Sequence, residues 1–351
     1  MTWSSVVDDR AGTTVKTPVD SPRVLAYCHD GVGLGHLRRT LNICEHLGAA
    51  YRRMTFLVAT GNPYVSLFGQ IKHADYLKLP SIRKVDNDVY VPKFLQLASE
   101  RVLRHRESLL LETARCFDPH IVLVDKAPLG VCGELVSTLK WIRRRRPTAR
   151  IVFGMRDIED EPEATVRQWS KLGVQQMLEE YFDEVWVYGM RNVFDVAREY
   201  RLSANIQAKL RFLGYVTRGL CDHRCELGFE TDRALQHARE HQSANGQRRR
   251  CVLVTVGGGT DGTELLNTYL GEAAVRATAA GASTVIVSGP DFPRDDASVL
   301  RGVAAAIPNV EWIEFARCMR CLIRQADLVV CMGGYNTLCE VAHLGKNALV
   351  V

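Results

Sequence analysis

Two glycine-rich turns and one histidine are the residues of this 351-residue chain whose spacing favours chemistry on an anion. An apolar run at 23–28 leads into GVGLGH (31–36), and another at 251–256 leads into GGGT (257–260). Glycines after a strand let backbone amides approach an anion, and the helix behind them points its positive end at it. The glycines and the added hydroxyl donor are Gly33, Gly35, Gly257, Gly258, Gly259 and Thr260. A phosphate is the expected ligand. His36 can supply a base near neutral pH, or a cation beside a departing phosphate.

A third turn of this kind lies near the end of the sequence. The apolar run 328–332 ends in Gly333-Gly334, and apolar residues then recur at helical spacing until Gly345. Glu340 falls about one and a half turns into this helix, where a carboxylate can accept hydrogen bonds from ribose hydroxyls. The simpler alternative is an ordinary strand-helix-strand crossover with a glycine cap and a solvated glutamate.

The spacing of the first turn argues against a nicotinamide dinucleotide. Its pattern is G-x-G-x-G-H, with His36 where the third glycine of the dinucleotide fingerprint belongs. The next apolar run, 54–59, ends in Thr60 and Gly61 and not in the acid that would hold an NAD ribose. For His36 itself, capping of the helix that it opens is the alternative to a role in chemistry.

Strands and helices must alternate to position these turns. Strands are predicted at 23–28, 54–59, 76–79, 121–125, 150–155, 185–188, 211–213, 251–256, 283–288, 310–315 and 328–332, and helices near 37–47, 93–117, 133–145, 163–181 and 193–200. Alternation with short connections predicts an α/β fold with parallel sheets wound on both faces. Ligands of such sheets bind beyond the carboxyl ends of the strands.

Two of the predicted strand ends carry charged residues. The strand at 121–125 ends in Asp125-Lys126, and the strand at 150–155 is followed by Arg156-Asp157. Asp157 is the alternative to His36 as general base, while Asp125, Lys126 and Arg156 are candidates to bind an acceptor or neutralise a phosphate. For the acidic residues 159–161, a solvated loop that caps the following helix is an equally good interpretation.

Four blocks in order resemble glycosyltransferase family 28, and most closely a bacterial branch of predicted glycosyltransferases. They are GVGLGHLRRTLNI (31–43), MRDIEDEP (155–162), VTVGGGTDG (254–262) and GGYNTLCEVAHLGKNALVV (333–351). With FARCMRCLIRQADLVV (315–330), the resemblance covers most of the chain from Arg23 onward. It implies the GT-B fold, in which two Rossmann-like, doubly wound parallel-sheet domains face a cleft.

The resemblance also implies roles for single residues. The first glycine loop would face the cleft with His36 at the reaction centre, and the two later loops would hold a donor diphosphate. Backbone groups at Phe315 and Ala316 would bind uracil with Met319 packed nearby, although core packing is the alternative for these side chains. Glu340 would bind the ribose. The donor-site motif also includes Asn336 and Thr337.

The activity implied by the resemblance is metal-independent transfer of a hexose from a UDP-sugar to a hydroxyl acceptor, with inversion at the anomeric carbon. The UDP-sugar is a substrate, and no cofactor is expected. The acceptor is left open between a lipid and a small molecule. A UDP-sugar 2-epimerase, which shares the fold, is one alternative.

The predicted organisation is a flexible leader (1–22), an acceptor-side domain (23–222), a linker (223–250) and a nucleotide-sugar domain (251–351). In the resembling family the chain continues with a proline-rich loop whose Glu-Gln pair touches the donor sugar, and with a helix that returns to the first domain. This sequence ends at Val351, so the last domain is expected to be truncated. A non-catalytic partner subunit of another transferase is therefore a second alternative.

Composition excludes several classes of protein. A content of 46% hydrophobic and 24% charged residues is globular, and a net charge of +5 is too small to indicate nucleic acid. No apolar run approaches the 18 or so residues of a membrane span, and no signal peptide is evident, so a cytoplasmic protein is expected. The basic run 143–146 beside Trp141-Ile142 is a candidate for peripheral contact with anionic lipid at the inner membrane face.

Three patterns could suggest a metal, and we predict none. Asp86-Asn87-Asp88 lies in a polar stretch without a leading strand, while C-x-H-x-C (221–225) and C-x-x-C (318–321) are each only half of a zinc site. The second pair lies in a helical pattern, which favours core thiols. The 11 cysteines are expected to be free, since they are scattered through a chain with two large cores.

Overall fold

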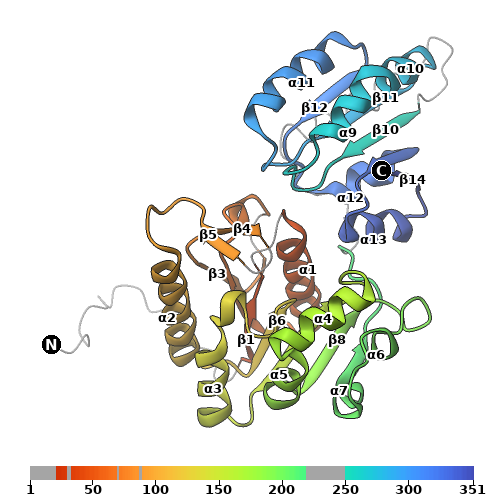
Figure 1. The fold of residues 1–351 in the computed structure, drawn as a ribbon. Helices are drawn as coiled ribbons and strands as arrows, with labels where there is room; N and C mark the ends of the chain where they lie inside the picture. Colours follow the sequence, from red (N-terminus) through yellow and green to blue (C-terminus); the bar gives the residue numbers. More distant parts are fainter. Residues whose placement is uncertain (1–20, 30–32, 69–70, 87–88, 219–249) are drawn as a thin grey trace, which may run out of the picture.

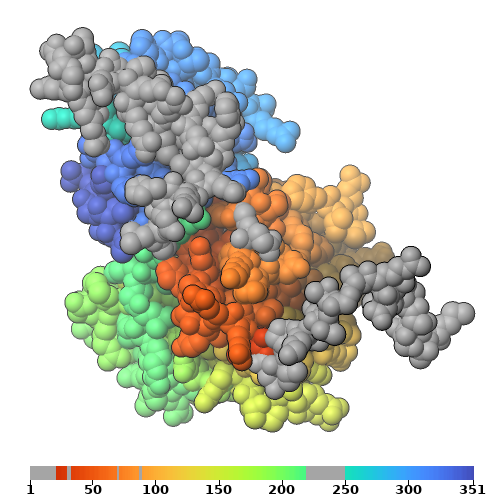
Figure 2. Space-filling view, turned by 180° about the vertical axis from the view of Figure 1, so that it is seen from behind, coloured from red at the N-terminus to blue at the C-terminus, as the bar shows by residue number. Residues whose placement is uncertain are grey.

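The computed structural model describes residues 21–29, 33–68, 71–86, 89–218 and 250–351, which form two parallel-sheet domains (Figure 1). Nearly all of the predicted leader (1–22) and linker (223–250) lies outside the described residues, as does the cysteine-histidine pattern at 221–225. Seen from behind, the blue C-terminal domain sits on green and orange segments of the N-terminal one (Figure 2).

The N-terminal domain is built on a seven-stranded sheet in the order β3-β2-β1-β6-β7-β8-β9, with all neighbours parallel. The strands are β1 (Arg23–Tyr27), β2 (Thr55–Thr60), β3 (Ala74–Lys78), β6 (Ile121–Asp125), β7 (Arg150–Arg156), β8 (Glu184–Tyr188) and β9 (Leu210–Phe212). The strand order reverses between β1 and β6. The carboxyl ends of these two strands therefore border the crevice in which doubly wound sheets bind ligands.

The helices of this domain follow the predicted alternation. They are α1 (Gly35–Ala50), α2 (Ser99–Phe117), α3 (Val136–Arg145), α4 (Pro162–Leu172), α5 (Val174–Tyr181), α6 (Val196–Glu199) and α7 (Ala204–Lys209), with short 3-10 turns η1 (Val65–Phe68) and η2 (Val131–Gly133). The single helix predicted at 163–181 is two helices, because Gly173 adopts a left-handed φ of 64° and ends α4. Glu161 accepts the amides of Glu163 and Ala164, so the acidic loop does cap α4.

An antiparallel hairpin replaces the polar loop and early helix start predicted near 82–98. It consists of β4 (Ile82–Asp86) and β5 (Val89–Pro92), and α2 begins only at Ser99. Its strands are mostly exposed, with Ile82 as the buried anchor, so they lack the apolar run that marks a central strand. Of the D-x-D pattern, Asp86 ends β4, and the two following residues lie outside the description.

The C-terminal domain has a five-stranded parallel sheet in the order β12-β11-β10-β13-β14. Its strands are β10 (Cys251–Thr255), β11 (Ser283–Val287), β12 (Val310–Ile313), β13 (Leu328–Cys331) and β14 (Asn347–Val350). The helices are α9 (Thr263–Thr268), α10 (Ala274–Ala279), α11 (Arg294–Ala306), α12 (Met319–Gln325) and α13 (Tyr335–His343), with a π-helical turn η3 (Tyr269–Ala273) between α9 and α10. The order reverses between β10 and β13, the two strands that lead into glycine turns.

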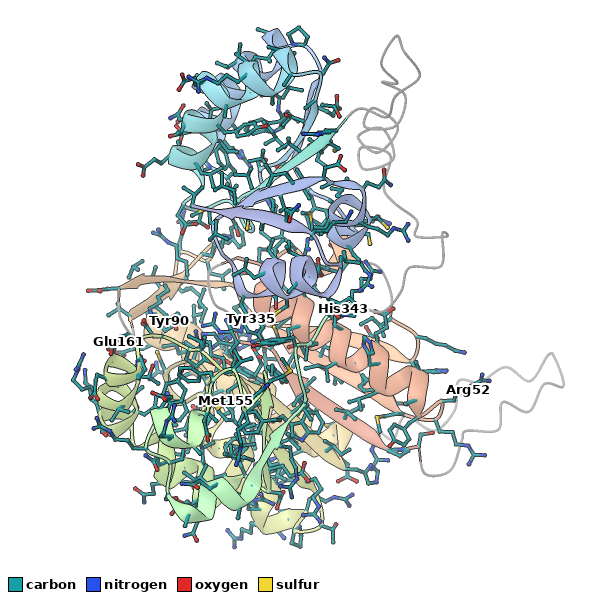
Figure 3. The ribbon with its side chains drawn as sticks, turned by 90° about the vertical axis from the view of Figure 1, so that its right-hand side faces the viewer. Arg52, Tyr90, Met155, Glu161, Tyr335 and His343 are labelled. Carbon is teal, nitrogen blue, oxygen red and sulfur yellow. The ribbon has the colours of Figure 1, made fainter. Side chains whose placement is uncertain are left out.

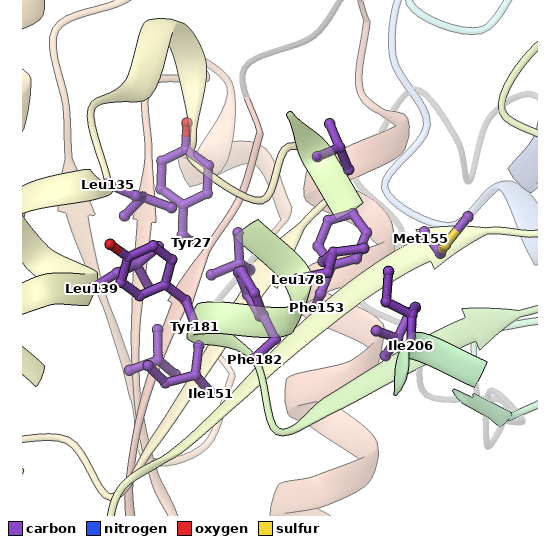
Figure 4. Packing of buried hydrophobic residues seen from close by; sticks show 14 of the residues in the cluster. Tyr27, Leu135, Leu139, Ile151, Phe153, Met155, Leu178, Tyr181, Phe182 and Ile206 are labelled. Carbon is purple, nitrogen blue, oxygen red and sulfur yellow. The ribbon is translucent and has the colours of Figure 1, made fainter. Parts of the chain in front are cut away.

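Apolar side chains cover both faces of the N-terminal sheet, as parallel strands require. On one face, Phe153 and Phe182 pack edge to face at 5.7 Å between ring centroids, beside Leu178 (Figure 4). On the other face, Leu37 of α1 packs in a cluster with Phe56 of β2. The core thus holds α1, and with it the first glycine turn, against the sheet.

The apolar residues beside the basic run 143–146 are part of the domain interior. Ile142 is buried and Trp141 packs against the core cluster, so neither forms an apolar foot. Arg143 is paired with Asp183 and Arg146 with Asp118. The structure therefore does not support peripheral membrane contact at this place. No helix in the described ranges is long and apolar enough to cross a bilayer.

A buried ion pair fixes the end of β1 just before the first glycine turn. Arg106 donates to both carboxylate oxygens of Glu134 at 2.6 and 2.7 Å, and Tyr27 donates to the same carboxylate at 2.6 Å. The side chains of Arg106 and Glu134 are 0% and 1% exposed. The Tyr27 hydroxyl in turn accepts a hydrogen bond from the backbone amide of Val131.

We expect Arg106→Leu to lower the free energy of unfolding by about 3–5 kcal/mol, because it leaves the Glu134 carboxylate buried without its cation. Urea denaturation followed by circular dichroism measures this. The matched control is Arg115→Leu on the same helix, where the pair with Glu112 is exposed and is worth about 0–1 kcal/mol. Equal denaturation midpoints for both variants would contradict the assigned role of the buried pair.

Candidate functional site

A cavity of about 320 Å³ lies between the two domains and brings the predicted loops together. Among the residues that line it are Gly33, Gly35, His36, Arg156, Gly257, Gly258, Gly259, Thr260, Phe315, Ala316, Met319, Gly334, Asn336, Thr337 and Glu340. Four predicted site residues do not line it, namely Asp125, Lys126, Asp157 and Gly333. The glycine turns of both domains, the ribose candidate and the histidine thus share one cavity.

The first and second glycine turns touch each other across the domain boundary. A Cβ on Gly258 would lie 2.5 Å from the Cα of Gly33, which is far closer than packed atoms allow. Gly33 and Gly259 have left-handed φ angles of 76° and 103°, which favour glycine. In addition, the Asn336 side chain donates to the carbonyl of Gly35 at 2.7 Å. The two domains therefore meet at the backbone of the predicted phosphate-binding turns.

His36 is held by a buried carboxylate and does not cap its helix. Its Nδ1 lies 2.6 Å from an oxygen of Asp125, while the N-cap residue of α1 is Leu34 and has no side-chain cap. Arg39 donates to the other Asp125 oxygen at 2.6 and 3.1 Å, and its Nη2 lies 2.9 Å from the same Nδ1. In the tautomer with its hydrogen on Nδ1, His36 donates a hydrogen bond to the Asp125 carboxylate, and Nε2 is the basic nitrogen.

Burial keeps His36 neutral near pH 7. Burial lowers the pKa of His36 below 6.5, and the opposing effect of Asp125 does not cancel this. Burial alone would raise the pKa of Asp125, but Arg39 and His36 outweigh it and hold the carboxyl well below its usual range. His29, 5.3 Å away ring to ring, has its pKa lowered by burial and by His36. A neutral imidazole beside an ionised carboxylate is the arrangement of a general base.

Asp157, the alternative base, does not line the cavity. The residue is 2% exposed, one carboxylate oxygen accepts the amide of Ile158, and its backbone carbonyl accepts the hydroxyl of Tyr200. Burial and the adjacent Asp157 carboxylate raise the pKa of Tyr215 to about 12. A Cβ on Gly189 would come within 2.3 Å of Asp157, so the carboxylate is closely packed. These contacts give Asp157 a structural place.

The other charged candidates have separate partners. Arg156 lines the cavity and donates to Glu159, whose carboxylate also lies 3.6 Å from Lys126. Burial alone would raise the pKa of Glu159, but Lys126 and Arg156 outweigh it and lower the pKa. Asp125 binds His36 and Arg39 and does not line the cavity. Arg156 is therefore the candidate of this group that the structure brings to the cavity.

The opposite end of the cavity is bounded by Arg38, Met319 and Glu340, which also line an adjoining cavity of about 400 Å³. Arg38 donates to the carbonyl of Ala316 at 3.4 Å and lies over the rings of Phe68 and Phe315 at 5.5 and 6.0 Å. Its buried Nε has no hydrogen-bond partner in the described structure. This guanidinium therefore has donors left for a ligand.

Glu340 is 8% exposed at the junction of the two cavities. Burial raises its pKa, although the nearby Arg38 and Arg320 oppose that effect. A carboxylate in this place accepts hydrogen bonds strongly because little water competes for it.

Three residues of the site, Arg38, Arg39 and Tyr335, were not predicted from the sequence. Arg39 follows His36 by three residues on α1, so both lie on one helix face, and this spacing was a usable signal. Tyr335 belongs to the glycine-turn motif, but its partner Tyr188 is 147 residues away in the chain. No local pattern announces such a contact.

The described residues contain no cluster of three or more His, Cys, Asp or Glu that could hold a metal. Cys318 and Cys321 are buried in a core cluster, and all nine cysteines in the described ranges are free thiols. These thiols match the prediction for the second half-site.

Comparisons with known proteins agree with this geometry. Residues 252–351 match the model of the glycosyltransferase family 28 C-terminal domain. No curated protein sequence matches the chain. Among solved structures, a UDP-glucosyltransferase from Polygonum tinctorium is similar at 15% identity with a TM-score of 0.57, covering 95% of this chain and 80% of that one.

Two further structures resemble the whole chain. Phytolacca americana UGT2, complexed with UDP-2fluoro-glucose and pterostilbene, has 12% identity and a TM-score of 0.56, with 94% and 80% of the chains covered. A putative UDP-N-acetylglucosamine 2-epimerase from Listeria monocytogenes has 12% identity and a TM-score of 0.59, with 95% and 79% covered. The predicted two-domain GT-B fold is thereby confirmed.

Proposed function

We propose that this chain, which has the GT-B fold and a C-terminal domain of the glycosyltransferase family 28 type, is a cytoplasmic, metal-independent transferase. It moves a hexose from a UDP-sugar to a hydroxyl acceptor with inversion. The observation that carries the proposal is the single cavity lined by His36, by Glu340 and by glycine turns of both domains. The likeness to the Polygonum tinctorium UDP-glucosyltransferase and to Phytolacca americana UGT2 with bound UDP-2fluoro-glucose supports the donor class.

The proposed chemistry needs one base and one anion-binding surface. The acceptor oxygen attacks the anomeric carbon, the bond from that carbon to the diphosphate oxygen breaks, and UDP leaves. Nε2 of His36 takes the acceptor proton, and Asp125 stabilises the imidazolium that forms. Backbone amides of the turn at 257–259, of Gly334 and of the start of α13 receive the charge that develops on the diphosphate.

The nucleoside is proposed to lie between the two cavities. Glu340 accepts the ribose hydroxyls, and the backbone of Phe315 and Ala316 meets the uracil edge. Arg38 donates to the Ala316 carbonyl at 3.4 Å, and this oxygen can accept a second hydrogen bond from the base. The Nε of Arg38, which has no partner among the described residues, is then available to the nucleotide.

Release of UDP from a panel of UDP-sugars, measured with and without hydroxyl acceptors, tests the proposal. Small-molecule and lipid-linked alcohols form separate arms, because the acceptor class is not fixed by the cavity. Acceptor-dependent UDP release with formation of an inverted glycoside is the expected result. If no UDP-sugar binds in calorimetry, the donor assignment fails.

The epimerase alternative is favoured by one observation, the likeness to the Listeria monocytogenes structure. An epimerase would convert a UDP-N-acetylhexosamine without any acceptor, which proton NMR of the sugar detects. A non-catalytic partner subunit would bind the UDP-sugar but give neither product alone. Acceptor-dependent release therefore separates our proposal from both.

We expect Gly258→Ala to weaken UDP-sugar binding by about 1–3 kcal/mol, or roughly 5- to 150-fold in the dissociation constant. The added Cβ would meet the Gly33 backbone, which cannot rotate away. Gly271→Ala in the same domain is the matched control, because a Cβ there meets nothing within 4 Å. Equal affinities of the two variants would mean that the donor binds without this contact between the turns.

A further inference from the structure

Tyr335 belongs to the C-terminal domain, but its ring lies against the N-terminal domain (Figure 3). It is the first residue of α13, and the two residues that follow it line the cavity. Its ring packs on a core cluster of the N-terminal domain, and its hydroxyl donates to the backbone carbonyl of Tyr188. The helix that carries Glu340 is thus anchored in the domain that carries His36.

Two guanidinium groups of the N-terminal domain lie over the Tyr335 ring. Their central carbons are 5.9 Å (Arg39) and 5.8 Å (Arg156) from the ring centroid. Arg39 also lies 5.0 Å from the ring centroid of Tyr188, so two tyrosine rings contact the same cation. The face of an aromatic ring attracts a guanidinium, more strongly where water is excluded. Tyr335 therefore helps to determine where Arg39 lies.

Arg39 connects this ring to the base. It binds one oxygen of Asp125 at 2.6 Å, and the other oxygen of Asp125 lies 2.6 Å from His36 Nδ1. Asn336, next to Tyr335, adds a second tie because it donates to the carbonyl of Gly35, the residue before His36. The start of α13 is thus joined to the histidine through side chains and through the backbone.

We propose that Tyr335 is a positioning residue that couples helix α13 to the orientation of His36 through Arg39 and Asp125. The inference rests on the proposed function, since it takes α13 as part of the donor site and His36 as the base. When α13 moves on binding a nucleotide, the ring moves Arg39, and the carboxylate and imidazole follow. The base is in place only while the donor domain is docked.

The titration of His36 reports on this coupling without any substrate. The charged and titratable groups that face it are Asp125 at the end of β6, Lys126 after it, Arg39 on α1, His29 after β1 and Glu159 after β7. Asp125 raises the pKa of His36, while burial, Arg39 and Lys126 lower it. If the Tyr335 ring is removed and Arg39 moves away, the pKa of His36 must rise.

The test is an NMR titration of the histidine ring protons in ligand-free protein, with the His36 signal assigned by its loss in His36→Gln. Tyr335→Leu removes the aromatic face and is expected to raise the pKa of His36 by about half a unit or more. Tyr335→Phe keeps the face and should leave the pKa near its wild-type value. Tyr335→Met is the second variant, should the Leu protein not fold.

The matched control is Tyr64→Phe. The Tyr64 hydroxyl also crosses the domain boundary, lying 2.8 Å from an oxygen of Asp291 and 3.0 Å from the Pro290 carbonyl oxygen, but it does not touch Arg39. It should leave the His36 titration unchanged. A wild-type pKa in folded Tyr335→Leu or Tyr335→Met protein would overturn the inference.

Addition of UDP separates this inference from the proposed function. At a UDP concentration that saturates each protein, UDP should shift the His36 signal in wild-type protein but not in Tyr335→Leu. A UDP-induced shift that survives in Tyr335→Leu contradicts the coupling. Absence of UDP binding by wild-type protein contradicts the proposed function alone, because the ligand-free titration needs no nucleotide.

Discussion

His36→Gln is expected to lower the turnover of sugar transfer by about 10²- to 10⁴-fold, because the variant lacks a base for the acceptor proton. The dissociation constant of UDP should stay close to wild type, since the imidazole contacts Asp125 and Arg39 and the nucleotide is proposed to rest on the other domain. Initial rates of UDP release and calorimetry with UDP measure the two quantities. His105→Gln, an exposed position on α2, is the control.

The rate of sugar transfer should depend on pH through the titration of His36. The neutral imidazole is the active form, and the pKa of His36 is lowered, so the rate should rise with pH through a midpoint below 6.5 and then level off. Asp125→Asn removes an influence that raises this pKa, so its midpoint should lie lower still, with reduced turnover. A wild-type rate in His36→Gln would remove the histidine from the mechanism.

Glu340→Ala is expected to weaken UDP binding by about 1.5–3 kcal/mol, or roughly 10- to 150-fold, which is the range for hydrogen bonds to a charged group. The carboxylate is buried at the junction of the two cavities. Calorimetry with UDP and with 2′-deoxy-UDP measures the effect. Wild-type protein should prefer UDP, and the variant should bind both nucleotides with similar affinity.

The exposed Glu272→Ala in the same domain is the control and should keep the wild-type preference. Burial raises the pKa of Glu340 above 4.5, the usual pKa of glutamate. As the pH is lowered, the carboxylate should therefore be protonated, and the affinity for UDP should fall, already at a pH above 4.5. Unchanged discrimination between the two nucleotides in Glu340→Ala would show that the ribose is bound elsewhere.

The elements that carry the glycine turns could be predicted closely from the sequence. The strand at 121–125 matches β6, and β10 and β13 differ by one residue at their ends from the predicted 251–256 and 328–332. Buried parallel strands are continuous apolar runs, so their ends are visible in the local pattern. The hairpin of β4 and β5 was not predicted, because its strands are mostly exposed and do not form a continuous apolar run.

The partners of the charged residues could not be predicted in this way. Asp125 and Asp157 both follow apolar strands and looked alike in the sequence, yet one binds His36 and the other is packed against Gly189 and Ile158. The strand end determines where a side chain begins. The neighbours that it meets depend on how the sheet and its helices pack.

The sequence by itself determined the two parallel sheets, the three glycine turns at strand ends and the residue types beside them, because periodicity and glycine content are local properties of the chain. Only the tertiary structure decided that Asp125 supports His36, that Gly33 meets Gly258 and that Tyr335 reaches Arg39. His36 and Asp125 are 89 residues apart, and Asn336 and Gly35 are 301 apart. Contacts at such separations follow from the packing of whole domains, which no short stretch of sequence encodes.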